Sequence, residues 1–336
     1  MEGEDAVMLL GDPGLRILPF VVGCWAWGDD KGVWGWDHTS RDPSYNAYDR
    51  ELNEQSILGA FEASLQHGVM MFDTAEAYGT GLSETLTGGM VVAAQQQGTP
   101  ALVATKFMPY KWKHMDVAKA MPQAVEESLR RLGVCKIDLY QIHNPGHPSG
   151  IAAQAHALAD VYLSGKAASV GVSNFSVKEL KELLRVFRER GVPLASNQIE
   201  FSLLRQIPLQ DGMLKLLRDS GAQLLAYSPL GMGRLTGKYS ARNQPEGRRG
   251  FGNIPWPKLQ PLVDELGAVG QRYGKSPGQV ALNWVLCQGA IPIAGAKNEE
   301  QARENAGAMG WRLQPSDVQN LTRLGQVGGY SNWQHG

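Results

Sequence analysis

The fold of this chain is decided by the stretch Met70-Met71-Phe72-Asp73-Thr74-Ala75-Glu76-Ala77-Tyr78-Gly79. Three apolar residues precede an aspartate and a turn-like run ends in Tyr-Gly, which predicts a buried strand whose carboxyl end opens into a loop. The loop carries Asp73 and Tyr78. Taken alone, these two residues are explained equally well as a salt-bridge anchor and a packing ring.

Two further strand-like runs end in an ionisable residue. Residues 101–105 lead into Lys106, and residues 137–142 lead into His143. Three successive strands therefore each deliver an ionisable side chain at the same end. This recurrence favours a functional site over isolated structural residues.

The composition is that of a globular protein that handles small molecules. The 336 residues suffice for one large α/β barrel or for two ordinary domains. The hydrophobic content is 43%, the charged content is 19% and the formal net charge is -1. This balance gives no basic field for nucleic acid or an anionic membrane. We expect the partners to be small molecules or other subunits, and the protein to be a monomer or weak homo-oligomer.

The cysteines and the chain start bear on the compartment and on metal binding. Cys24, Cys135 and Cys287 are widely spaced without a CxxC pair, which favours reduced thiols and argues against a zinc site, so we expect no metal. No apolar run approaches ~18 residues, so no membrane span is expected. Residues 1–5 are acidic, unlike a targeting peptide. We expect a cytoplasmic protein, with the plastid stroma as the alternative if a transit peptide has been removed.

Short apolar strands alternate with helical patterns along the whole chain. A hairpin is expected around residues 12–14, and Asp116 is expected to cap a helix. Strands are expected at residues 20–23, from 70, from 101, and at 137–142, 167–173, 194–198, 223–227 and 291–294. Helices are expected at residues 54–67, from 83, and at 116–132, 152–164, 177–190, 209–220 and 277–287, with a further one holding Gln301.

This strict order predicts α/β architecture, with a closed (β/α)8 TIM barrel as a single domain over residues 1–336. Parallel pairing with helical crossovers places the ligand site at the C-terminal face of the strands. An open doubly wound sheet is the alternative, but residues 22–28 lack the GxGxxG spacing that follows its first strand. Two long insertions, residues 29–53 and 237–254, are expected to cover the ligand face.

Seven motifs occur in order along the chain, at residues 73–79, 104–106, 139–143, 171–175, 197–198, 226–231 and 291–298. Together they resemble the motifs of the aldo-keto reductases, especially the plant and cyanobacterial branch of uncharacterised oxidoreductases and pyridoxal-reductase-like enzymes. The match runs nearly end to end. The resemblance implies that the catalytic tetrad of the family falls on Asp73, Tyr78, Lys106 and His143.

The chemistry of carbonyl reduction suits these four residue types. A developing alkoxide needs a proton donor, and lowering the pKa of a tyrosine from about 10 to near 7 takes about 4 kcal/mol. An ammonium at ~4 Å supplies about that much at an effective dielectric of ~20, so Lys106 is expected to lower the pKa of Tyr78. Asp73 would hold Lys106, and His143 would donate to the substrate oxygen. The alternative is a structural ion pair and a core histidine.

The resemblance also implies a nicotinamide site. Residues matching Ser173, Asn174 and Gln198 hold the carboxamide in the family, and Tyr227 stacks on the ring. The Gly-rich loop, residues 228–238, suits a pyrophosphate. Lys297 is the candidate contact for a 2′-phosphate, which favours NADP(H), although Gln301 stands where many relatives have Arg. The expected cofactor contacts beyond the carboxamide are Ser228, Leu230, Gly231, Gly233, Arg234, Lys238, Gly295, Lys297, Gln301 and Asn305.

The sequence says least about the substrate. Trp25, Trp27 and Asn144 are the expected pocket residues, and Asn144 replaces a Trp common in close relatives. Nothing separates pyridoxal from aromatic, lipid-derived or sugar aldehydes. We expect an NADP-dependent enzyme that reduces aldehydes or ketones to alcohols with Tyr78 as proton donor. The alternatives are a nicotinamide-binding regulatory subunit with little turnover and another barrel chemistry such as an isomerase. Further aromatic candidates for the mouth are Trp34, Trp36, Tyr45, Tyr48 and Trp112.

Overall fold

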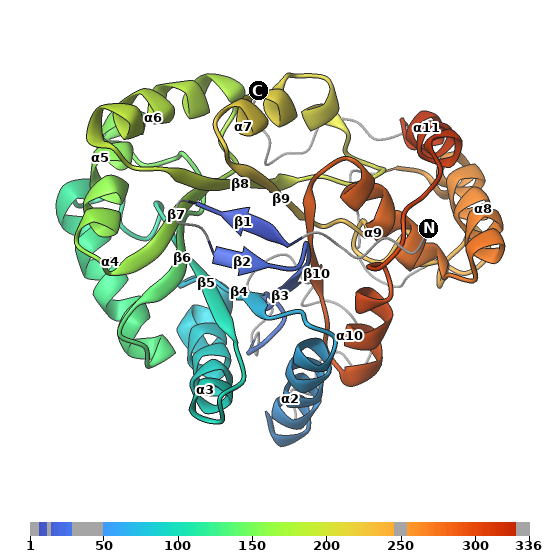
Figure 1. Cartoon of the computed structure of the whole chain (residues 1–336), viewed down its shortest axis with the longest axis horizontal. Helices are drawn as coiled ribbons and strands as arrows, with labels where there is room; N and C mark the ends of the chain where they lie inside the picture. The colour runs from blue at the N-terminus through green and yellow to red at the C-terminus, as the bar shows by residue number, and fades with distance from the viewer. Residues whose placement is uncertain (1–6, 12–14, 29–49, 245–253, 327–336) are drawn as a thin grey trace.

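A computed structural model describes residues 7–11, 15–28, 50–244 and 254–326. Within these residues, parallel strands close into a barrel in which the last strand pairs with the first, as Figure 1 shows. The predicted (β/α)8 barrel is therefore confirmed. The barrel strands are β3 (Val21–Gly23), β4 (Met71–Asp73), β5 (Leu102–Phe107), β6 (Ile137–Ile142), β7 (Ala167–Ser173), β8 (Leu194–Glu200), β9 (Gln223–Tyr227) and β10 (Ile291–Gly295).

Helices surround the barrel and bury their apolar faces against its outer surface. No helix in the described ranges is both long and apolar enough to cross a membrane. The helices are α2 (Arg50–Gln66), α3 (Leu82–Gln96), α4 (Val117–Leu132), α5 (Gly150–Leu163), α6 (Val177–Arg190), α7 (Met213–Asp219), α8 (Trp256–Tyr273), α9 (Pro277–Cys287), α10 (Glu299–Ala306) and α11 (Pro315–Leu324), with 3-10 turns η1 (Tyr78–Gly81) and η2 (Ile207–Leu209).

The expected N-terminal hairpin closes one end of the barrel. Strands β1 (Met8–Leu10) and β2 (Leu15–Ile17) pair antiparallel and cross the barrel opening in Figure 1. Leu10 and Ile17 are buried in the inner core cluster, and Ser169 Oγ of β7 donates to Leu10 O at 3.0 Å. Because this end is plugged, a ligand must enter from the other end, where the strands finish.

Three predicted helix boundaries are explained by capping. Asp116 accepts from Ala118 N at the start of α4, and capping boxes built on Ser176 and Ser276 start α6 and α9. Each box satisfies two backbone N–H groups, that of the capping serine and that of the residue three positions later. Pro277 follows its box at the first turn, where a missing N–H costs nothing.

Other boundaries differ from the sequence-based expectation. Helix α7 begins at Met213 rather than at residue 209, because Pro208 sits in η2 and Gly212 has a left-handed φ of 87°. Helix α2 begins at Arg50, four residues earlier than expected. Helices α8 and α11 were not predicted, and in α8 an internal Pro261 obscured the pattern. Most of the first insertion and residues 245–253 of the second lie outside the described residues.

Candidate active site

The centre of the site is a buried ion pair between strands β4 and β5. Asp73 ends β4 and is 2% exposed, and Lys106 in β5 is 0% exposed. Lys106 Nζ donates to Asp73 Oδ1 at 2.5 Å and to Thr74 O at 2.7 Å. Burial alone would lower the pKa of Lys106, but Asp73 and Tyr78 outweigh it and the pKa is raised. The ammonium therefore keeps its charge inside the barrel.

Asp73 is also held on its second oxygen. Gln141 Nε2 donates to Asp73 Oδ2 at 3.1 Å, and Gln198 Nε2 donates to it at 2.9 Å. The role of Gln141 was missed from the sequence, although an amide two residues before His143, near the end of its strand, was a usable signal. These bonds give the carboxylate a full set of donors, as a buried charge requires.

Tyr78 and His143 complete the tetrad of Asp73, Tyr78, Lys106 and His143. Tyr78 Oη accepts from Lys106 Nζ at 3.4 Å. The ring of His143 meets that of Tyr78 edge-on, with centroids 5.6 Å apart. Burial, with a smaller contribution from the charge of Lys106, lowers the pKa of His143 to about 3. The imidazole is therefore neutral at pH 7 and keeps one N–H to donate.

The expected low pKa of Tyr78 is wrong for this structure. Its pKa is raised, because burial outweighs the attraction of Lys106 and the charge of Asp73 opposes it further. The expectation from the sequence included the attraction of the Lys106 ammonium for the tyrosinate. It left out the opposing charge of Asp73, whose Oδ1 lies 2.5 Å from Lys106 Nζ. Tyr78 is consequently protonated at neutral pH and holds the proton that it would deliver.

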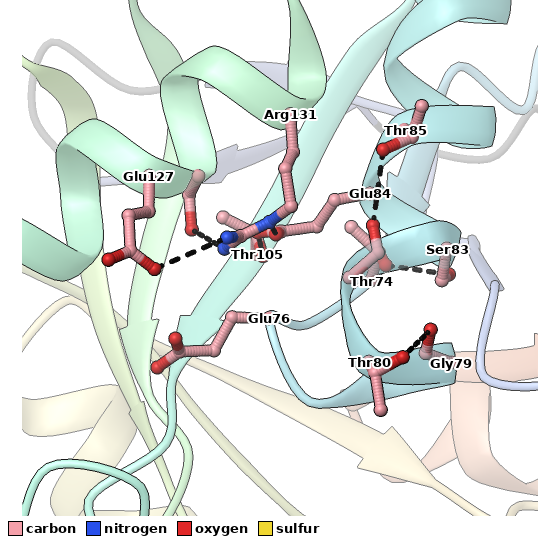
Figure 2. A network of polar contacts seen from close by, with 12 residues as sticks. Thr74, Glu76, Gly79, Thr80, Ser83, Glu84, Thr85, Thr105, Glu127 and Arg131 are labelled. Carbon is pink, nitrogen blue, oxygen red and sulfur yellow. Dashed lines mark hydrogen bonds and ion pairs between the residues drawn. The ribbon is translucent and has the colours of Figure 1, made fainter.

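The turn after Tyr78 is left-handed over three residues. The φ angles are 53° at Gly79, 54° at Thr80 and 97° at Gly81. A β-branched residue in this region is strained, so the surroundings must hold Thr80 there. A Cβ on Gly81 would lie 2.7 Å from Arg131 Cδ, and residues with a side chain rarely adopt its φ of 97°, so this position favours glycine. Thr74 and Ser83 are also hydrogen-bonded across the loop at 2.7 Å, as Figure 2 shows.

The four residues expected to hold a nicotinamide carboxamide and ring lie together beside the tetrad. Ser173 Oγ donates to Gln198 O at 2.8 Å, and Tyr227 Oη donates to Asn174 Oδ1 at 2.9 Å. Asn174 has a φ of 60° and donates to His143 O at 3.1 Å. An asparagine tolerates this left-handed conformation better than most residues. The strand ends β6, β7, β8 and β9 are thereby tied into one surface.

The expected phosphate loop follows β9 and is built from tight turns. Positive φ angles occur at Ser228 (52°), Gly231 (55°), Gly233 (89°) and Gly237 (76°). A Cβ on Gly231 would come 2.8 Å from Leu204 Cδ1, so this glycine fits a close approach. Leu230 of this loop is half-buried and packs against the core, and Lys238 is exposed.

Arg234 is in a different setting from the one expected of a phosphate contact. Its side chain is buried, with the residue 7% exposed, and its Nη1 donates to Ile254 O at 2.8 Å. The guanidinium also stacks over the ring of Trp256 at 5.2 Å, and burial lowers its pKa. Arg234 therefore joins the loop to the start of α8.

The turn between β10 and α10 carries the remaining expected contacts. Asn298 caps α10, and Gln301 Oε1 accepts from Lys297 N at 2.9 Å. Asn305 Nδ2 donates to Gly295 O at 3.1 Å. The amides of Gln301 and Asn305 thus shape the turn, and the side chain of Lys297 is exposed beside it.

The expectation that Trp27 lines the substrate pocket is wrong. It is 0% exposed, its Nε1 donates to Ala296 O at 2.8 Å and its ring lies 6.0 Å from that of Phe72. Trp27 lies in the turn after β3, and its side chain packs in the hydrophobic core. Trp25 is half-buried. Trp34, Trp36, Tyr45 and Tyr48 lie outside the described residues.

Asn144 lies directly beside the tetrad. It is half-buried, its Oδ1 accepts from Gly146 N at 3.0 Å and its Nδ2 points to Met108 Sδ at 3.8 Å. Trp112 is buried and donates its Nε1 to Glu76. This Trp–Glu contact makes Trp112 a loop anchor, and Glu76 is a second residue whose role sequence reasoning missed.

Known proteins place the chain in a family. A family model described as the aldo/keto reductase family matches residues 22–326. A chloroplastic pyridoxal reductase from Arabidopsis thaliana is 35% identical over 89% of this chain and 80% of its own. The glycerol dehydrogenase structure from Gluconobacter oxydans has a TM-score of 0.77 and 27% identity over 95% of this chain and 94% of its own. An aldo/keto reductase from Klebsiella pneumoniae in complex with NADP and acetate has a TM-score of 0.73 and 22% identity over 98% of both chains. The chain belongs to the aldo/keto reductase family.

Proposed function

We propose that this protein is an NADP(H)-dependent reductase that converts aldehydes or ketones to alcohols. The observation that carries the proposal is Lys106 Nζ, which contacts Asp73 Oδ1 at 2.5 Å and Tyr78 Oη at 3.4 Å. A phenol, an ammonium, a carboxylate and an imidazole meet there at the open end of the barrel. This is the set that carbonyl reduction needs for proton delivery.

The residues beside the tetrad fit a nicotinamide. Ser173, Asn174 and Gln198 offer hydroxyl and amide groups of the kind that hold a carboxamide, and Tyr227 offers an aromatic face. The reduced nicotinamide supplies the hydride when it is bound. Exposed Lys297 supports a 2′-phosphate and hence NADP(H). The NADP complex of the Klebsiella pneumoniae relative supports the same assignment.

The chain's own residues would handle the proton. As hydride adds to the carbonyl carbon, the π-electron pair moves to the oxygen, and Tyr78 donates its phenolic proton to that oxygen. Lys106 stabilises the tyrosinate left behind, and Asp73 keeps Lys106 in place. Neutral His143 donates a hydrogen bond to the same oxygen and orients it. The raised pKa of Tyr78 keeps the proton available at neutral pH.

The wider assignments are also proposals. We infer one barrel domain over residues 1–336, in a monomer or weak homo-oligomer. We favour the cytoplasm, and the chloroplastic Arabidopsis thaliana relative supports the plastid stroma as the alternative. Trp25 and Asn144 are the proposed pocket residues.

The test compares the wild type with Tyr78→Phe. We expect wild-type protein to oxidise NADPH in the presence of at least one member of an aldehyde panel. Tyr78→Phe should lower kcat by about 10²–10⁴-fold, because it removes the proton donor and leaves the shape. NADPH binding, followed by fluorescence quenching, should remain.

Two results would contradict the proposed reductase function. Tight NADPH binding by a wild type that reduces no aldehyde or ketone would favour the regulatory alternative. No binding of any nicotinamide nucleotide would favour another barrel chemistry.

A further inference from the structure

A chain of ion pairs runs behind the tetrad, outside the barrel wall. Arg131 Nε contacts Glu84 Oε2 at 2.5 Å, and Arg131 Nη1 contacts Glu127 Oε2 at 3.5 Å. Lys111 Nζ then bridges Glu127 at 3.1 Å and Glu76 at 2.8 Å. We call Glu76, Glu84, Lys111, Glu127 and Arg131 the ion network. Figure 2 shows its Arg131 part between α3 and α4, with Glu76 on the adjoining loop.

Glu76 is the member closest to Tyr78 in the sequence, two residues before it. Its side chain is buried and accepts from Met108 N at 2.6 Å, Lys111 Nζ at 2.8 Å and Trp112 Nε1 at 3.1 Å. Burial raises the pKa of this carboxyl, and the bonds from Lys111 and Met108 oppose the rise. Glu76 thereby joins the loop that carries Tyr78 to the loop that follows β5.

The other end of the network reaches Thr105, the residue before Lys106. The buried Glu84 accepts from Thr105 Oγ1 at 2.6 Å, and Thr105 directly precedes Lys106 in β5. Arg131 also packs under the left-handed turn, where a Cβ on Gly81 would meet its side chain. The two ends of the network therefore lie next to the two residues whose contact defines the tetrad.

The tetrad needs such a support. Its Lys106–Tyr78 contact of 3.4 Å joins a strand residue to a loop residue, so it depends on where the loop lies. Buried charges with several directed partners occupy one position, because any displacement leaves a donor or acceptor unpaired. The strained Thr80 turn shows that the loop is held against its own preference.

We propose that Glu76 is a positioning residue for the reaction, and that it sets the distance between Tyr78 and Lys106 by fixing the Tyr78 loop to Met108, Lys111 and Trp112. The inference rests on the proposed carbonyl reductase function. Glu76 contacts none of the reacting atoms and acts through Tyr78.

Glu76→Gln tests the proposal with little change of shape. A glutamine has one acceptor oxygen where the carboxylate has two, and its NH2 group would face the donors of Lys111 or Trp112. We expect kcat to fall by about 10- to 100-fold, as displacement of a reacting group by about 1 Å would produce. The NADPH dissociation constant should stay within about twofold, because the nicotinamide and phosphate contacts are elsewhere.

Asp219→Asn is the matched control. It also removes one carboxylate of an ion pair, but Asp219 pairs with Lys215 on the exposed side of α7. We expect its kcat to equal that of the wild type. At position 111, Lys111→Arg should retain kcat, and Lys111→Met should lower it by less than Glu76→Gln does, because two donors to Glu76 remain.

The readouts separate this inference from the proposed function. A wild type that reduces no carbonyl contradicts the proposed function, whereas an active wild type with unchanged kcat in Glu76→Gln overturns the positioning role. An equal loss of kcat and NADPH affinity also overturns it, because it indicates general loosening. A crystal structure of Glu76→Gln decides the matter without turnover: the Tyr78–Lys106 contact should lengthen, and retention of 3.4 Å would refute the proposal.

Discussion

The two ends of the proposed site are built differently. At the tetrad end, Lys106 and Asp73 are buried and every charged atom has directed partners within the barrel. At the phosphate end, Lys238 and Lys297 are exposed on loops that follow β9 and β10, and Gln301 is exposed on the first turn of α10. The first end is fixed before any ligand arrives, and the second presents side chains to solvent.

The difference between the two ends matches the functions proposed for them. Proton delivery needs groups held at fixed distances in a region of low dielectric, because preorganised charges need no rearrangement during the reaction. Phosphate recognition needs a cation that a soluble ligand can reach. Substitutions that break the Asp73–Lys106 ion pair should therefore lower both stability and turnover, whereas those at the phosphate end should lower binding alone.

Lys106→Met is the strongest test of this comparison. It leaves Asp73 buried with the amides of Gln141 and Gln198 but without a cation. Loss of one partner of a buried pair costs about 3–5 kcal/mol, so the free energy of unfolding should fall by about that much. Turnover should also be lost. Urea denaturation and steady-state kinetics measure the two effects.

Lys215→Met supplies the reference for Lys106→Met. Lys215 forms an exposed pair with Asp219, with side-chain exposures of 78% and 57%, and such pairs contribute about 0–1 kcal/mol. If Lys106→Met were as stable as this control, the tetrad end would not be held together by its ion pair.

Lys297→Ala tests the other end and should have a smaller effect. Removal of an exposed cation beside the 2′-phosphate should raise the dissociation constant for NADPH by about tenfold, or about 1.4 kcal/mol. NADH affinity and the urea midpoint should not change. Fluorescence titration with both nucleotides measures this. Equal weakening of NADPH and NADH would refute the assignment of the phosphate contact.

Much of this organisation was predicted from local patterns. The barrel follows from strand and helix periodicity, and the ends of α6 and α9 follow from cap residues within a few positions of the boundary. Asp73, Lys106 and His143 were found because each follows an apolar strand, and parallel strands end on the same face. Helix α7 was placed wrongly because Pro208 and Gly212 divide what looked like one apolar pattern.

The remainder depends on contacts that the order of residues does not display. Glu76 meets Lys111 35 positions away, and Gln198 meets Asp73 125 positions away. The direction of the pKa shift of Tyr78 likewise depends on burial and on the charge of Asp73. Both depend on the fold and are not visible in the order of residues. Trp27 was taken for a pocket residue because aromaticity does not reveal which way a strand end turns.

The effect that is smallest at neutral pH concerns His143 and the pH dependence of stability. Its pKa is lowered from the usual value of 6.5 to about 3 in the folded protein. Between these values the unfolded chain binds a proton that the folded chain does not, so stability falls as the pH falls. His143→Asn removes this contribution. The stability of the variant relative to the wild type should therefore improve by about 1 kcal/mol for each pH unit from 6.5 toward 4.

Urea denaturation over this pH range measures the difference, with His156→Asn on the exposed side of α5 as the control. A difference that does not change with pH would mean that His143 is not desolvated beside Lys106. The tetrad end would then be open to water, like the phosphate end, and the contrast between them would be lost. A slope confined to His143→Asn would instead place the imidazole in the fixed, low-dielectric part of the site, where the ring stays neutral and keeps one N–H to donate to a carbonyl oxygen.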